Sequence, residues 1–140
     1  MIVAIGTDLV SVLRLKARLT AVPALAERIF TARERELCAG RTESLAARLA
    51  AKEAVLKALG SALAATASAA AVGDANSSGI HEPDSWRLTD IEVSSAPGAP
   101  PLLSLHGPAA HLAAALDVQC WHLSLAHDGG VALAYVVAEG

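Results

Sequence analysis

The segment ARLAAKEAVLKALG, residues 47–60, carries charged side chains within an otherwise apolar stretch. At about 100° per residue of a helix, Lys52 falls among the leucines, and Glu53 and Lys57 lie four residues apart beside them. Apolar residues on two faces indicate a helix covered on both sides, where a charge must be paired or bind a ligand. The pattern therefore indicates either a ligand site or an ordinary Glu–Lys pair with lysine stems lying on apolar surface.

Two further side chains could belong to the same site. Asp8 follows the apolar run MIVAI and a Gly-Thr pair, which places it at the end of a predicted strand. His127 stands at the end of another predicted strand, beside an Asp-Gly-Gly turn, where sites are often assembled. Cys120, His122 and His127 match no common zinc spacing, and strand alternation separates them, so no zinc cluster is expected.

Helices in the first half of the chain and strands in the second half must position these residues. The expected elements are a strand at 1–5, helices at 9–19, 23–30, 32–38 and 44–59, strands at 86–93 and 102–105, a helix at 108–116, and strands at 118–126 and 131–137. Thr31 and Glu34 have the spacing of a capping box, and Gly60 is the expected end of the longest helix. Residues 61–85, rich in Ala, Ser and Gly, are predicted to form a flexible insertion. The predicted fold class is α+β, with N-terminal helices packed on an antiparallel sheet in a single domain over residues 1–140.

Composition and charge narrow the class of partner. The 140 residues are 54% hydrophobic, which favours a globular domain over a disordered chain. Residues 1–60 hold 10 of the 11 Lys and Arg residues against six acidic ones, whereas residues 61–140 hold one against eight. The basic part suits a phosphorylated ligand or an acidic partner, or is simply a solvated face. Nucleic acid is not expected, because the basic residues lack interleaved aromatic residues and the net charge is −3.

The N-terminal segment and the cysteines bear on location. MIVAIGTDLV lacks the basic segment of a secretory signal, and no stretch has the composition of a membrane span. Cys38 and Cys120 match no redox or metal pair. We therefore expect a cytoplasmic protein with no membrane partner. Its apolar residues are mostly Ala, Leu and Val, with 3% aromatic residues, which makes a subunit interface plausible as a further source of burial.

Five segments resemble, in this order, the motifs of the holo-acyl-carrier-protein synthase group of 4'-phosphopantetheinyl transferases: IGTDLV, RIFTARE, ARLAAKEAVLKALG, DIEV and LSLAHDGGVALAYVV. Together they span nearly the whole chain apart from residues 61–85, and their combination in one short domain is specific. The resemblance implies transfer of the 4'-phosphopantetheine arm of coenzyme A to a serine of an apo acyl carrier protein. It also implies release of 3',5'-ADP and dependence on Mg²⁺. The acceptor would be a carrier of fatty-acid, polyketide or peptide synthesis.

The same resemblance assigns roles to residues of this chain. Asp8 and Glu53 are expected to hold Mg²⁺, and two carboxylates suit a cation that keeps waters and takes pyrophosphate oxygens. Glu53, directly or through a water, is the expected base for the carrier serine. Lys57 is expected to reach the coenzyme A phosphates, and Arg48 and His127 to lie along the phosphate-binding surface.

The remaining expectations concern Lys52 and the partners. Lys52 is expected to contact the ligand or to fix Glu53. The first helix is expected to receive the acidic carrier protein through Arg14 and Arg18, with neighbouring apolar residues adding contact. The group forms homotrimers with sites at subunit interfaces, and the resemblance implies the same assembly here.

Three features depart from the pattern of the group. Ala126 replaces the serine that commonly precedes the histidine, and Leu49 stands where Phe is usual. After Gly60 the group usually has a compact Gly-Thr-Gly turn, which this chain lacks. These departures leave two alternatives open: a catalytically weak relative that binds carrier proteins, and a related phosphate-transfer enzyme with another nucleotide donor.

Overall fold

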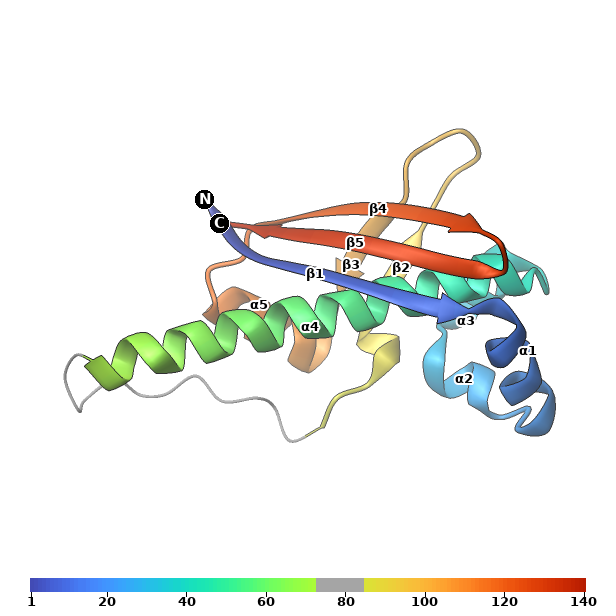
Figure 1. Ribbon diagram of the computed structural model, residues 1–140, viewed down its shortest axis with the longest axis horizontal. Coiled ribbons are helices and arrows are strands. Elements are labelled where there is room, and N and C mark those ends of the chain that lie inside the picture. Colours follow the sequence, from blue (N-terminus) through green and yellow to red (C-terminus); the bar gives the residue numbers. More distant parts are fainter. Residues whose placement is uncertain (73–84) are drawn as a thin grey trace.

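The computed structural model describes residues 1–72 and 85–140, which form the α+β fold expected from the sequence (Figure 1). The strands are β1 (Ile2–Ser11), β2 (Ile91–Ser94), β3 (Leu102–Leu105), β4 (Cys120–Asp128) and β5 (Val131–Glu139). The helices are α1 (Val12–Ala21), α2 (Leu25–Ile29), α3 (Ala32–Cys38), α4 (Thr42–Val72) and α5 (Gly107–Ala115), with a 3-10 turn, η1 (Leu88–Asp90), before β2. Most of the helical structure therefore precedes most of the sheet along the chain.

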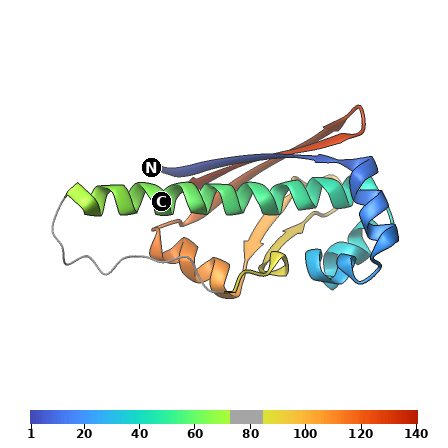
Figure 2. The ribbon, with the colours of Figure 1, turned by 60° about the horizontal axis from the view of Figure 1, so that its bottom comes forward.

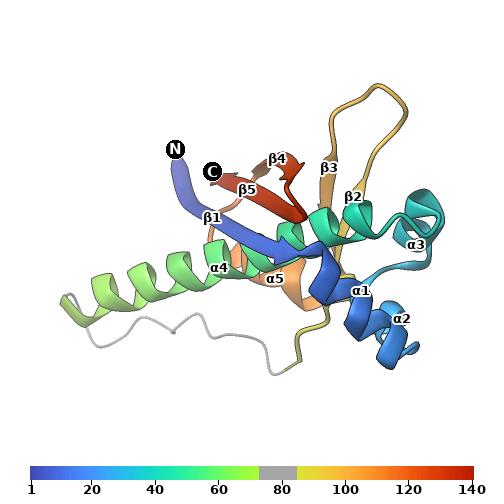
Figure 3. The same cartoon turned by 45° about the vertical axis from the view of Figure 1, so that its right-hand side comes forward.

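Helix α4 lies between two layers (Figure 2). On one side β1, β5 and β4 form an antiparallel sheet in the order β1-β5-β4. On the other side lie α5 and the antiparallel pair of β2 and β3. The short helices α1, α2 and α3 gather around the end of β1 and the start of α4 (Figure 3). The core is thus built around α4, which is covered on both faces, as the apolar pattern of its sequence indicates.

Small side chains make the contact between α4 and the sheet. The buried alanines of α4 and β5 are Ala46, Ala47, Ala50, Ala51, Ala54, Ala58, Ala62, Ala132, Ala134 and Ala138. Gly6 of β1 comes closest to the helix, since a Cβ atom on Gly6 would lie 1.9 Å from the carbonyl oxygen of Ala54. Only glycine allows this approach. Because β1 carries Asp8 and α4 carries Glu53 and Lys57, the contact sets how close these side chains come.

The substitution Gly6→Ala is expected to lower the free energy of unfolding by about 3 kcal/mol, because the new methyl group meets backbone atoms. Gly60→Ala is the matched control: nothing lies within 4 Å of a Cβ atom placed there. Alanine is also the better helix former by about 1 kcal/mol, so this control should be at least as stable as the wild type. Urea unfolding measures both values. A Gly6→Ala protein of wild-type stability would show that β1 does not need the close approach.

Local structure is as predicted where a cap or a turn fixes the chain. Helix α3 begins with the predicted capping box, in which Thr31 and Glu34 each accept a hydrogen bond from the other's backbone N–H. The β4–β5 hairpin turns at Gly129 and Gly130, whose φ angles are 57° and 77°. Two consecutive positive φ angles are what a type I′ hairpin turn requires, which explains the glycine pair. The predicted strand at 102–105 is also confirmed.

Two predicted strand boundaries are wrong. The first strand was expected to end at Ile5, but β1 continues to Ser11 because its later residues pair with β5 in regular register. Asp8 therefore lies within a strand, opposite Ala134, and not at a strand end. The strand expected at 86–93 begins only at Ile91, after the 3-10 turn.

The helix expected to end at Gly60 continues to Val72, so residues 61–72 of the predicted flexible insertion are helical. A single glycine costs a helix only about 1 kcal/mol, and the alanine-rich segment that follows favours helix strongly. Ala62 is buried, and Leu63 is half-buried, which anchors the first turn beyond the glycine. Residues 73–84 of the predicted insertion lie outside the described residues. Within the described part, no helix combines the length and apolar character needed to cross a membrane.

Candidate active site

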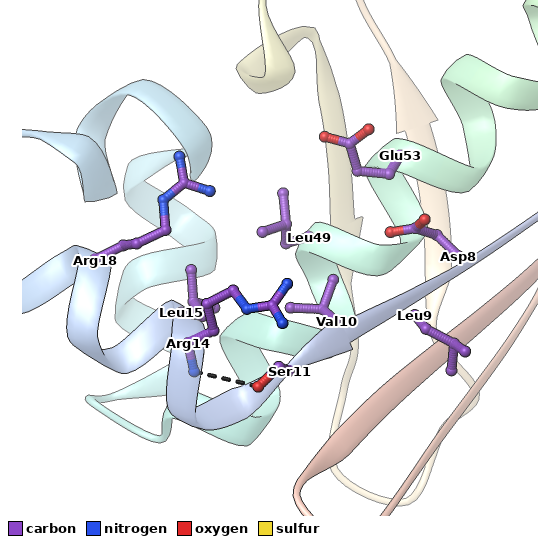
Figure 4. Close-up of a pocket in the computed structure, with 9 residues that line it drawn as sticks. All are labelled: Asp8, Leu9, Val10, Ser11, Arg14, Leu15, Arg18, Leu49 and Glu53. Atoms are coloured by element: carbon purple, nitrogen blue, oxygen red, sulfur yellow. Dashed lines mark hydrogen bonds between the residues drawn. The ribbon is translucent and has the colours of Figure 1, made fainter.

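A groove of about 280 Å³ opens between β1, α1 and α4 (Figure 4). Its two walls carry opposite charges. Asp8 and Glu53 form the acidic wall, and Arg14 and Arg18 of α1 form the basic wall on the opposite side. Apolar side chains lie between the walls: Val10, Leu15 and Leu49. The groove can therefore hold a cation on one side and an acidic group on the other.

The acidic wall joins residues that are far apart in sequence. Strand alternation turns the half-buried Asp8 toward α4, while its neighbours Thr7 and Leu9 are exposed. Lys57 on α4 donates a hydrogen bond from Nζ to Oδ1 of Asp8 at 2.6 Å, and another to the carbonyl oxygen of Thr7 at 3.2 Å. Its side chain remains 57% exposed, so this ammonium group is also accessible to a ligand. The structure thus brings Asp8, Glu53 and Lys57 together, as the sequence analysis expects.

Electrostatics indicate that the acidic wall suits a divalent cation. Burial raises the pKa of Glu53, and the negative charge of Asp8 raises it further, while Lys57 opposes this shift. A cation between the two carboxylates would relieve that repulsion. Mg²⁺ is commonly held by one or two carboxylates together with waters and substrate phosphates. The described residues contain no cluster of three or more His, Cys, Asp and Glu side chains for a metal, so waters or a ligand must supply the other positions.

The basic wall is positioned by the start of α1. Ser11 caps this helix, and its Oγ accepts a hydrogen bond from the backbone N–H of Arg14 at 3.2 Å. Arg14 and Arg18 are four residues apart and share one helix face. Both are exposed, and neither forms an ion pair with a described residue. Leu13, 78% exposed, adds an apolar side chain to the outer surface of the same helix.

Lys52 does not reach the groove. Its side chain is fully buried, and its Nζ donates hydrogen bonds to Oε1 of Glu34 at 2.6 Å and to the carbonyl oxygens of Leu88, at 2.9 Å, and Ile91. Burial lowers the pKa of Lys52, and the negative charge of Glu34 opposes this shift. The expectation that Lys52 contacts the ligand or fixes Glu53 is therefore wrong. This lysine joins α4 to α3 and to the segment around η1.

The sequence alone does not identify Glu34 as the partner of Lys52. The capping-box spacing predicts only that Glu34 caps α3 at Thr31, a role that it does fill. The same side chain is fully buried, and its Oε2 accepts a hydrogen bond from the backbone N–H of Val93 at 3.1 Å. The available signal was Lys52 itself, since a lysine among leucines needs a buried acid nearby.

Arg48 and His127 do not line the groove. Arg48 is buried, and its guanidinium group donates hydrogen bonds to the carbonyl oxygen of Val93 at 3.3 Å and to Oγ of Ser95 at 3.1 Å. His127 is exposed, and its Nδ1 lies 3.7 Å from the carboxylate of Glu43. Arg48 belongs to the early turns of α4, and His127 of β4 lies beside Glu43 in the first turn of the same helix, so neither lines the groove within one chain. Their roles in phosphate binding remain predictions.

The chain matches a known protein family and several named relatives over nearly its whole length. Residues 4–136 match the ACPS family, whose description is the 4'-phosphopantetheinyl transferase superfamily. The holo-[acyl-carrier-protein] synthase of Frankia alni is 44% identical over 99% of this chain and 98% of its own length. The enzyme of the same name from Beutenbergia cavernae is 42% identical over 99% of each chain.

Solved structures share the fold. The ACPS–CoA complex from Chronobacterium ammoniagenes superposes with a TM-score of 0.75 and 32% identity, covering 96% of this chain and 95% of its own. The Helicobacter pylori holo-[acyl-carrier-protein] synthase in complex with coenzyme A gives a TM-score of 0.71 and 28% identity, covering 96% and 99%. Both similarities extend over nearly the whole length of the chains.

Proposed function

We infer that this chain, which belongs to the ACPS family of the 4'-phosphopantetheinyl transferase superfamily, is a holo-[acyl-carrier-protein] synthase that transfers the 4'-phosphopantetheine arm of coenzyme A to an acyl carrier protein. We further propose that the reaction depends on Mg²⁺ and releases 3',5'-ADP. The observation that carries the proposal is the groove, whose acidic wall suits a cation and whose basic wall suits an acidic partner.

The chemistry follows from the residues of the acidic wall. Asp8 and Glu53 would hold Mg²⁺, which would neutralise charge on the pyrophosphate of the donor. Lys57 supplies a further positive charge, because its exposed ammonium group can move from Asp8 to a phosphate oxygen. Glu53, directly or through a water, accepts the proton of the carrier serine. The serine oxygen bonds to the phosphorus of the arm, and 3',5'-ADP leaves with the electrons of the broken P–O bond.

The basic wall is the proposed docking surface for the carrier protein. An acidic carrier would pair with Arg14 and Arg18, which have no ion-pair partner among the described residues. Leu13 on the same helix would add apolar contact. A carrier docked on α1 would present its serine to a groove whose other wall holds the phosphate-transfer residues, which is the geometry that the reaction needs.

The substitution Arg14→Glu is expected to raise the KM for the carrier protein about tenfold or more at low salt, because a like charge then faces the acidic carrier. The KM for coenzyme A should stay unchanged. Arg33→Glu is the control, since Arg33 is an exposed arginine of α3 that does not line the groove. Steady-state kinetics with each substrate varied in turn gives both constants. An unchanged carrier KM at low ionic strength would remove Arg14 from the interface.

A homotrimer is the proposed assembly, and the outer face of the sheet supports it. Ile5 and Leu9 of β1 are exposed on this face, as are Leu133 and Tyr135 of β5. The two strands pair with Leu9 opposite Leu133, so the apolar side chains form one continuous surface. Such a surface on a small domain favours a covering subunit.

A neighbouring subunit would also explain how Arg48 and His127 could take part in binding the phosphates of the donor. Neither lines the groove within one chain, and an adjacent copy could bring them to a donor bound there. The substitution Tyr135→Asp is expected to convert the trimer into monomers and to reduce transfer, because it places a charge on the apolar face. Ser61→Asp, on the exposed side of α4, is the control. Light scattering after gel filtration measures the mass, and a monomeric wild-type protein would contradict the assembly.

The direct test of the function is intact-mass spectrometry of an apo acyl carrier protein after incubation with this protein, coenzyme A and Mg²⁺. A mass gain of one phosphopantetheine that EDTA prevents is the expected result. Carrier binding without a mass gain would favour the catalytically weak, carrier-binding relative. Modification that requires a different nucleotide donor would favour the other phosphate-transfer enzyme.

A further inference from the structure

Among the described residues, Lys57 is the only cation that forms an ion pair with the acidic wall of the groove. Its Nζ lies 2.6 Å from Oδ1 of Asp8 and 3.2 Å from the carbonyl oxygen of Thr7. Glu53, four residues before Lys57 on α4, has no ion-pair partner in the same part of the chain. The lysine therefore pairs across to β1, although the spacing of four residues would also allow a pair with Glu53 along the helix.

This pair places a positive charge on a carboxylate that a metal ion would use. The side chain of Asp8 is 17% exposed, and Lys57 binds one of its two oxygens. An ammonium group and a divalent cation on the same carboxylate repel each other at such short range. A metal ion can therefore bind Asp8 tightly only if Lys57 moves away.

The surroundings of Lys57 allow this movement. Its side chain is 57% exposed, and its flexible four-carbon stem lets the ammonium group reach other acceptors. Lys52 on the same helix is the contrast, since its Nζ is enclosed by Glu34 and two carbonyl oxygens. Leaving Asp8 nevertheless costs Lys57 its ion pair, unless another anion takes the ammonium group.

We propose that Lys57 exchanges partners during binding: it neutralises Asp8 while the groove is empty, and it passes to a phosphate of the donor when a metal ion is bound at Asp8 and Glu53. The proposal rests on the function proposed above, which has the metal held by these two carboxylates. Because the displaced ammonium group finds its new partner on the donor, metal and donor favour each other's binding. By linkage, each raises the affinity of the other by the same factor.

The test measures the affinity for the metal without the donor. Electron paramagnetic resonance detects free Mn²⁺, a cation that suits the same oxygen ligands as Mg²⁺. We expect Lys57→Met to lower the Kd of Mn²⁺ for the free protein about fivefold, because the competing charge on Asp8 is gone. A lysine that served only to bind the donor phosphates would leave this Kd unchanged.

Three control variants make the result specific. Lys57→Arg keeps a positive charge that can pair with Asp8, so its Kd for Mn²⁺ should stay within about twofold of the wild type. Lys16→Met removes an exposed charge of α1 that does not line the groove, and it should also bind Mn²⁺ as the wild type does. Glu53→Gln should weaken Mn²⁺ binding both alone and combined with Lys57→Met, which locates the metal.

A second titration repeats the measurement with saturating coenzyme A. Coenzyme A should lower the Kd of Mn²⁺ for the wild type and for Lys57→Met, because its phosphates can coordinate the metal directly. The decrease should be about fivefold larger for the wild type, since only there does the donor also take up a displaced ammonium group.

Three results would overturn the proposal. The first is a Kd of Mn²⁺ for free Lys57→Met that is within about twofold of the wild type or higher. The second is an equal decrease of this Kd for Lys16→Met, which would show a general effect of net charge. The third is an equal effect of coenzyme A on the wild type and on Lys57→Met.

The proposed function can fail separately from the exchange. Transfer to the carrier protein is measured by mass spectrometry, so transfer with Glu53-dependent Mn²⁺ binding, but with no effect of Lys57→Met on that binding, would refute the exchange alone. The expected Mn²⁺ affinities without transfer would support the exchange and count against the proposed function. Absence of Glu53-dependent Mn²⁺ binding would overturn the exchange together with the proposed metal site.

Discussion

Replacing Glu53 with Gln is expected to lower the rate of phosphopantetheine transfer roughly a thousandfold or more, without loss of the fold. The amide keeps the shape of the side chain but removes the charge that would bind Mg²⁺ together with Asp8. It also removes the proposed base for the carrier serine. Intact-mass spectrometry at several Mg²⁺ concentrations measures the loss, and added Mg²⁺ should not restore the rate.

The same substitution is expected to stabilise the metal-free protein at neutral pH. Burial and the charge of Asp8 raise the pKa of Glu53 in the folded state, so the ionised form costs folding free energy above that pKa. The gain from Glu53→Gln should shrink as the pH falls through the raised pKa, and it should vanish below the pKa of the unfolded chain. Higher stability combined with lost activity is typical of a residue kept for function.

Glu36→Gln is the control for this experiment, because Glu36 is an exposed glutamate of α3 that does not line the groove. It should leave both the rate and the stability close to those of the wild type. Transfer within about tenfold of the wild-type rate by a folded Glu53→Gln protein would contradict the assignment of Glu53. If the same variant were less stable than the wild type, this would contradict the expectation that ionised Glu53 costs folding free energy in the metal-free protein.

Replacing Lys52 with Met is expected to lower the free energy of unfolding by about 3 to 5 kcal/mol, because Glu34 would be left as an unpaired buried charge. The methionine side chain is similar in length to that of lysine. The loss of stability therefore comes mainly from the ion pair with Glu34 and from the hydrogen bonds to the carbonyl oxygens of Leu88 and Ile91. Urea unfolding measures the change. At a temperature where the variant is folded, its KM for coenzyme A should equal that of the wild type.

Two comparisons make the result specific. Lys57→Met changes an exposed lysine of the same helix and should alter stability by no more than about 1 kcal/mol. The double variant Lys52→Met with Glu34→Met removes both buried charges and should recover part of the loss, although the cap of α3 is then missing. A Lys52→Met protein with wild-type stability and a raised KM for coenzyme A would restore Lys52 to the ligand site.

Features with a local cause could be predicted from the sequence. The capping box of Thr31 and Glu34 and the Gly129–Gly130 turn depend on neighbouring residues, and both are present. The acidic pair was predicted from the resemblance, and the structure brings its members together because β1 packs on α4. Gly60 shows the limit of such reasoning, since a glycine stops a helix only when the residues after it do not favour helix.

Features that depend on distant contacts could not be predicted from the sequence alone. Gly6 follows the predicted strand at 1–5, and nothing in the neighbouring residues shows that α4 passes directly over it. The partner of Lys52 lies eighteen residues away and already had a local explanation as a cap. Leu112 and Trp86 line an apolar hollow beside α4, and their approach to this helix is set by tertiary packing.

The pairing of β1 with β5 has a consequence for biosynthesis. The side chain of Thr7 bonds to the carbonyl oxygen of Ala134, 127 residues further along the chain. During translation β1 leaves the ribosome long before β5, so the pairing of β1 with the central strand of the sheet must wait until β5 has been synthesised. Until then the alanine face of α4 lacks the two strands β5 and β4 of the sheet that covers it, and contacts of such long range form slowly. A nascent chain of this protein is therefore expected to need protection from aggregation until β5 is available for pairing.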